Sequence, residues 1–190
     1  AYVFEDDFDK WGLLVDGKET YNERDPNSMP DTFFGSALWY NATNAAANDK
    51  CGSVSGSQSL RFSGKNSRWA ETKGLDVRHG GWVNFWLKFG PDGPKASPDC
   101  DTAFVGDVQL WYAVEEEDGV MAKNWTRWAE FSPTYYPSDG RCNLERHELP
   151  REAWSKATRL RFDQPSFVDR RDHFAIDDLN VFAYFPDNWH

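Results

Sequence analysis

Strict alternation of apolar and polar side chains is the feature that most constrains what this chain can fold into. In residues 82–89, apolar side chains occupy every second position, and Asn84 and Lys88 lie between them. Residues 108–114 repeat the same period of two. Because successive side chains of a β-strand point to opposite faces, both segments are predicted to be strands with one buried face.

Shorter segments continue this pattern, and turn residues separate them. Alternating runs occur at residues 59–62, 125–131, 158–164 and 174–182, and segments rich in turn residues occur at 25–30, 90–94 and 133–141. Residues 41–48 are rich in Ala and Asn and are expected to form one short helical turn. Many short strands joined by Gly and Pro turns predict an all-β fold, an antiparallel two-sheet β-jelly-roll sandwich.

Charge and composition exclude several classes of partner. The 190 residues include 21 basic and 31 acidic side chains, a formal net charge of -10, which excludes nucleic acid or anionic lipid bound across the whole surface. No apolar run approaches the roughly 20 residues that span a bilayer, so no membrane insertion is expected. Aromatic residues make up 16% of the chain, which indicates an ordered core. Since no repeat or linker divides the sequence, it is predicted to be a single module over residues 1–190.

Cysteines and glycosylation sequons indicate the compartment. The three cysteines fit either one disulfide with a spare thiol or three reduced thiols, and their spacing does not decide between these. Asn41 and Asn124 each precede a Thr by two residues, with no Pro between, and both are candidate glycosylation sites. Two sequons together with cysteines favour a secreted or cell-surface glycoprotein. The chain is therefore interpreted as a segment of a larger extracellular protein.

Two acidic clusters lie near the ends of the chain. Residues 5–9 include Asp6 and Asp7, and residues 174–178 include Asp177. The first and last strands of an antiparallel sandwich commonly lie side by side, so these carboxylates could converge. Calcium requires oxygen ligands at about 2.3 to 2.6 Å, and carboxylates gathered without a cation would repel one another. On spacing alone, solvated strand ends are the simpler interpretation.

The sequence contains no catalytic set that points to one reaction. An acidic run at residues 115–118 resembles the carboxylate supply of a sugar hydrolase, but it stands between a predicted strand and Gly119, as a charged hairpin tip would. The four histidines are scattered, without the spacing of a zinc site. No phosphate-binding loop and no nucleophile elbow occurs. The chain is therefore predicted not to be an enzyme.

Tryptophans on or beside the predicted strands allow two interpretations. These residues are Trp69, Trp82, Trp86, Trp111 and Trp128. Core packing is expected for most of them, whereas rings exposed on a sheet face could stack on sugars or form a protein interface. The second possibility keeps a carbohydrate-binding module as an alternative function.

A series of short motifs, in order along nearly the whole chain, resembles the jelly-roll subrepeats of reelin. They lie at residues 51–64 (CGSVSGSQSLRFSG), 85–90 (FWLKFG), 108–113 (VQLWYA), 149–150 (LP), 157–165 (ATRLRFDQP) and 175–178 (AIDD). Each motif is short, and their order and spacing together are specific. The AIDD motif at residues 175–178 and an early pair of Phe and an acidic residue are also similar to MAM domains. These domains usually carry a different set of cysteines, so they are the second choice.

The resemblance to reelin subrepeats implies a structural calcium ion close to the junction of the first and last strands. Asp177 matches the family's ligand position, and either Asp6 or Asp7 is expected to join it from the first strand. The resemblance also implies a disulfide between Cys51 and Cys100.

Function and partners follow from the same resemblance. It implies a non-enzymatic extracellular module for adhesion or assembly, bound to a protein partner or to neighbouring modules of the same chain. Cys142 would be left over, as a free thiol or as a link to another chain. A carbohydrate-binding module with a glycan as partner is the alternative, and a glycosidase or polysaccharide lyase is the third choice.

Overall fold

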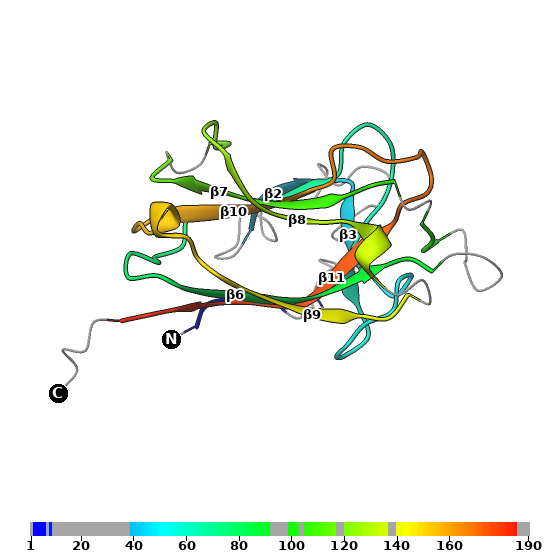
Figure 1. Ribbon diagram of the computed structural model, residues 1–190, viewed down its shortest axis with the longest axis horizontal. Helices are drawn as coiled ribbons and strands as arrows, with labels where there is room; N and C mark the ends of the chain where they lie inside the picture. The colour runs from blue at the N-terminus through cyan, green and yellow to red at the C-terminus, as the bar shows by residue number, and fades with distance from the viewer. Residues whose placement is uncertain are drawn as a thin grey trace, which may run out of the picture.

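Two antiparallel β-sheets face each other across a shared core in the computed structural model (Figure 1). The structure describes residues 2–6, 8, 39–91, 99–102, 105–116, 120–136 and 140–185. Within these residues, strands provide all of the regular structure except two short 3-10 helices, η3 (Pro133–Tyr135) and η4 (Arg151–Ala153). The predicted antiparallel two-sheet sandwich is confirmed.

The six-stranded sheet is built around its last strand. Its order is β3 (Ala45–Asn48), β4 (Ser59–Phe62), β11 (Phe174–Ala183), β6 (Gly81–Phe89) and β9 (Asn143–Glu148), and β1 (Tyr2–Asp6) also pairs with β11. The five-stranded sheet has the order β2 (Trp39–Thr43), β5 (Trp69–Thr72), β10 (Thr158–Asp163), β7 (Val108–Val114) and β8 (Thr126–Phe131). The long alternating runs of the sequence are therefore central strands of these sheets.

Aromatic rings fill the space between the sheets. Every second residue of β6 is buried, as its alternation predicts. Phe85 of this strand makes edge-on contacts with Phe131 at 5.7 Å and Phe162 at 5.0 Å between ring centroids, and both partners belong to the opposite sheet. Phe62 and Phe174 stack at 4.2 Å within the six-stranded sheet. These contacts join the two sheets into one core.

The first and last strands lie side by side, as the sequence predicts. Antiparallel pairing runs from Tyr2 opposite Phe182 to Asp6 opposite Leu179. The same edge of β11 pairs with β4 over residues 174–176, so β4 and β1 follow one another along it. A bulge interrupts the pairing of β11 with β6 between Asp177 and Asn180, at this change of partner.

The expected helical turn at residues 41–48 is wrong. This stretch contains β2 and β3, which belong to different sheets. Asn44, the residue between them, has a φ of 53°, a left-handed conformation that Asn tolerates better than most residues. The single left-handed residue redirects the chain from one sheet to the other.

The described part of the chain contains no helix long and apolar enough to cross a membrane.

The core contacts lead to a stability prediction for Phe85, which is fully buried between the sheets. Replacing it with Ala leaves a cavity, and we expect the free energy of unfolding in urea to fall by about 3 to 5 kcal/mol. Leu144→Ala is the control, because this side chain is 49% exposed, and it should cost less than about 0.5 kcal/mol. Equal losses for the two variants would contradict the described core.

Candidate functional site

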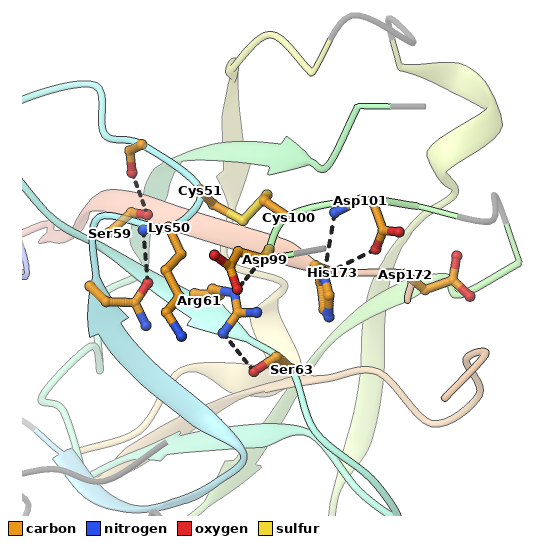
Figure 2. Close-up of a disulfide and its surroundings, with 12 residues drawn as sticks. Lys50, Cys51, Ser59, Arg61, Ser63, Asp99, Cys100, Asp101, Asp172 and His173 are labelled. Atoms are coloured by element: carbon orange, nitrogen blue, oxygen red, sulfur yellow. Dashed lines mark hydrogen bonds and ion pairs between the residues drawn. A yellow bond between two sulfur atoms is a disulfide. The ribbon is translucent and has the colours of Figure 1, made fainter. Parts of the chain in front are cut away.

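A disulfide joins Cys51 to Cys100 on the outer side of the six-stranded sheet (Figure 2). The two Cα atoms lie 5.2 Å apart, and both cysteines pack against Ala175 of β11 in a small buried cluster. The pairing that the family resemblance implies is therefore confirmed. Cys142 is a free, half-buried cysteine, and burial raises the pKa of its thiol.

The segment that follows Cys51 is held by the carboxylate of Asp177. One oxygen of this carboxylate accepts hydrogen bonds from the N–H groups of Val54, at 2.7 Å, and Ser55, at 3.3 Å. The other oxygen accepts the N–H of Asp178 at 2.8 Å. The Ser55 hydroxyl also donates to the Asp178 carboxylate. The bulge in β11 thus fixes a loop that the disulfide anchors at its start.

The electrostatics of Asp177 reflect two opposing effects. Its side chain is 3% exposed, and burial raises its pKa to about 6, although the three N–H donors favour the charged form. The neighbouring Asp178 carboxylate raises the pKa further.

Asp177 fits the role of a single oxygen ligand for calcium. A carboxylate has about four lone-pair sites, and three are engaged by N–H donors, which leaves one for a cation. The backbone of Asp6 lies opposite Leu179, two residues beyond Asp177, but its side chain and all of Asp7 are outside the described residues. Among the described residues, no three His, Cys, Asp or Glu side chains gather as a metal site would require. The complete predicted ligand set therefore stays a prediction.

A polar network lies beside the disulfide, between the segment at Cys100 and β4 (Figure 2). Arg61 of β4 donates to the carbonyl of Asp99 at 2.6 Å and to the Ser63 hydroxyl at 3.0 Å. The backbone N–H of His173 donates to the carbonyl of Asp101 at 2.8 Å. These bonds tie the segment that carries Cys100 to both β4 and the start of β11.

His173 is held neutral in this network. Burial lowers its pKa to about 3, and the cations of Arg61 and Arg68 add to the effect. Its Nδ1 accepts the backbone N–H of Asp101 at 3.2 Å and so carries no proton. The Asp172 carboxylate raises the pKa of His173, but burial outweighs this attraction.

Sequence reasoning missed a second buried polar group, which centres on Arg68. This side chain is fully buried and donates to Gln164 at 2.7 Å and to the carbonyl of Asp172 at 3.0 Å. The Asp172 carboxylate accepts the Thr102 hydroxyl at 3.1 Å. No local pattern marks these residues, because each stands beside a strand and its partners are distant in sequence.

The two sequons differ in accessibility. Asn41 is half-buried in β2, and its side-chain oxygen accepts the N–H of Ala42 at 2.8 Å. Asn124 is exposed just before β8, and its backbone N–H donates to Glu116 at 2.8 Å. Asn124 is therefore the more accessible candidate. Of the acidic run at residues 115–118, the last two residues lie outside the described part of the chain.

The tryptophans are divided between core and surface. Trp128 packs against the core, and Trp69 is only 8% exposed. Trp82 and Trp86 occupy the half-buried positions of β6, which alternate with its core residues, and Trp111 does the same in β7. Trp69 is buried, but it lies outside the core cluster, against Arg161. Core packing, expected for most of the five, is thus wrong for all except Trp128.

The disulfide should contribute measurably to stability. Replacing Cys51 and Cys100 together with Ala should lower the free energy of unfolding by about 4 kcal/mol, since the bridge closes a loop with a sequence separation of 49. Urea unfolding measures this loss. Cys142→Ala is the control: it keeps the bridge, so it should cost much less than the double replacement. A loss equal to that of the control would contradict the role of the bridge.

The lowered pKa of His173 leads us to expect a loss of stability in mild acid. Its pKa is lowered in the folded state, so the unfolded chain binds a proton first, and stability falls as pH drops below about 6.5 toward 3. Between pH 6.5 and 5.5 this histidine should account for about 1 kcal/mol. Urea unfolding of His173→Gln across this range should lack that component. If the free energy of unfolding changed with pH equally in the unmodified chain and in His173→Gln, a neutral, buried imidazole would be contradicted.

Three solved structures are similar to this chain. The K3 cleaved adhesin domain of Lys-gingipain from Porphyromonas gingivalis aligns with a TM-score of 0.52 at 15% identity, over 95% of this chain and 97% of that chain. The K1 adhesin domain of the same protein aligns with a TM-score of 0.47 at 13% identity, over 67% and 75%. A family 16 carbohydrate-binding module gives 0.42 at 13% identity, over 73% and 84%. At such identities the first of these supports the fold alone.

The match to a family model is more specific. Residues 44–181, more than half of the chain, match the model described as Reelin subrepeat B. The matched segment includes the disulfide, Asp177 and most of both sheets. The chain therefore belongs to the reelin subrepeat B family.

Proposed function

We propose that this chain is a non-enzymatic extracellular module for adhesion or assembly, which binds a protein partner or neighbouring modules of its own chain. The pairing of Tyr2 with Phe182 carries this proposal. Because β1 and β11 are antiparallel neighbours, the start of β1 and the end of β11 lie at the same end of the six-stranded sheet (Figure 1). Adjoining modules connected there would contact this end of the sheet first.

The proposed location is the cell surface or the secreted fraction. A disulfide between Cys51 and Cys100 persists in oxidising compartments and is rare in the reducing cytosol. The exposed sequon at Asn124 adds a surface acceptor for a glycan.

Calcium is proposed to stabilise the junction of β1 and β11. Asp177 retains one lone-pair site, and the acidic end of β1 runs toward the same bulge. The cation would neutralise carboxylates that otherwise repel one another, and Asp6 or Asp7 would supply the ligand from β1. An ion that binds only the folded form stabilises it by mass action.

Thermal unfolding tests the calcium proposal. We expect the melting temperature of the chain to be higher in calcium than in chelator, and this difference to disappear in Asp177→Asn. The comparison uses the calcium-dependent shift, because this variant also loses acceptors for the loop. Asp6→Asn and Asp7→Asn identify the ligand from β1, and Glu130→Gln is the control on the other sheet. The absence of any shift in the unmodified chain would remove calcium from the proposal.

Binding to the surface of the cells that produce the protein tests the adhesive function. A labelled chain should bind these surfaces, and treatment of the surface with protease should abolish binding. Removal of glycans should leave it unchanged. The reverse pattern would replace the protein partner with a carbohydrate.

Carbohydrate binding is the second candidate function, and one observation favours it. Trp111 and Trp125 are half-buried at the outer face of the five-stranded sheet. Partly exposed indole rings on a sheet face can stack on sugar rings.

A further inference from the structure

The outer face of the five-stranded sheet, the upper layer in Figure 1, presents two adjacent rows of side chains. Strand register places Trp69, Asp163, Gln109 and Glu130 in one row and Glu71, Arg161, Trp111 and Arg127 in the next. These residues alternate with core residues of the same strands, so they point away from the core. Every position in the two rows is aromatic or polar, and none is aliphatic.

Arg161 is the centre of this face. Its guanidinium lies 4.4 Å from the ring centroid of Trp69 and 5.7 Å from that of Trp125, and so contacts two indoles. It also pairs with Asp163 at 3.3 Å. Trp69 is buried, whereas Trp125 is half-buried. The arginine thus fixes the position of an accessible indole.

Trp111 is held in place by a chain of hydrogen bonds. Its indole N–H donates to Gln109 at 3.1 Å, and the Gln109 amide donates to Glu130 at 3.1 Å. Arg127 pairs with the same Glu130 oxygen at 3.1 Å. A ring oriented before binding loses little conformational entropy when a ligand stacks on it.

The segment before β8 closes one end of the face. The Ala122 N–H donates to Glu71 at 3.3 Å, and Arg159 pairs with the same carboxylate at 2.9 Å. The Trp125 indole N–H donates to the carbonyl of Ala122 at 3.0 Å. These contacts cover Glu71 and Arg159 and hold Trp125 at the border of the open area. We call Trp69, Gln109, Trp111, Trp125, Arg161 and Asp163 the tryptophan–arginine face.

The charges of this face favour an uncharged ligand. Its one arginine, Arg161, pairs with Asp163, and beside the face Arg127 pairs with Glu130. Arg159 and Glu71, at its closed end, form a buried pair. At its border Asp107 lies beside Glu130, and burial followed by this contact raises the pKa of Asp107. The surplus carboxyl disfavours an anion, and the paired arginines offer no net positive charge to one.

We propose that the tryptophan–arginine face binds a neutral saccharide, an inference that rests on the second candidate function. Trp111 and Trp125 stack on the C–H faces of successive sugar rings, which are apolar and match the negative faces of the indoles. Arg161 and Asp163 supply a donor and an acceptor for hydroxyl groups, and Gln109 supplies an amide. Few polar groups placed among aromatic rings are the usual composition of a ligand site.

Affinity electrophoresis tests this proposal with chain produced without N-glycans, so that a glycan on Asn41 or Asn124 does not cover the face. The gels contain galactomannan, xyloglucan or mixed-linkage β-glucan as neutral probes and polygalacturonate as the acidic one. We expect at least one neutral polysaccharide to retard the chain and polygalacturonate not to. Trp111→Ala and Trp125→Ala should each weaken retardation at least about tenfold. Trp82→Ala, on the other sheet, is the matched control and should bind as the unmodified chain does.

The remaining outcomes overturn the proposal in different ways. Retardation that survives both Trp111→Ala and Trp125→Ala would refute this site but leave carbohydrate binding. Its loss in Trp82→Ala would then place the binding on the other sheet. Retardation by polygalacturonate alone would refute the neutral ligand. No retardation in any gel would refute both the site and carbohydrate binding, and would leave the adhesive function untouched. If either Trp variant unfolds, Gln109→Ala replaces it and should also weaken binding.

Discussion

The pairing of β11 with three other strands is the constraint on which the rest of the structure depends. One edge of β11 pairs with β6 along most of its length, and the other pairs with β4 and then β1. Where the partner changes from β4 to β1, the register of the pairing between β11 and β6 shifts, between Asp177 and Asn180. The left-handed φ of 45° at Asp178 marks this interruption. Asp177 is thus the last residue in register with β6, and Asp178 is the left-handed residue of the bulge.

The loop after Cys51 explains why an acidic residue, Asp177, is buried on the outer side of this sheet. Asp177 is the last residue of β11 in register before the bulge, opposite Trp86, and its carboxylate accepts the N–H groups of the loop after Cys51. That loop has few apolar side chains and cannot hold itself by burial, so a covalent bridge and a carboxylate with three donors replace a hydrophobic contact. Removing one partner of such a buried group leaves the other unsatisfied, which costs more than the bond contributes.

The sequence predicted the features that depend on local periodicity. Alternation located β6 and β7 and assigned Phe85 to the core, because side-chain direction in a strand follows from position alone. The prediction of a helical turn at residues 41–48 was wrong, because a composition rich in Ala does not reveal that the chain passes from one sheet to the other at a left-handed residue, Asn44. The burial of Arg68 was equally hidden, because its partners are brought to it only by the completed sandwich. The disulfide was found through family resemblance, which carries information that cysteine spacing lacks.

The two sheets use their outer faces differently, and this separates the proposed functions in space. The six-stranded sheet has its outer side at β11 covered by the disulfide loop, and the junction of β1 and β11 lies along the same strand. The five-stranded sheet keeps partly exposed indoles in rows that ion pairs make neutral. A contact with a neighbouring module at the β1 edge would therefore not cover Trp111, since Trp111 lies in the opposite layer. One module could then hold its neighbour and a saccharide at the same time, with no residue shared between the two surfaces.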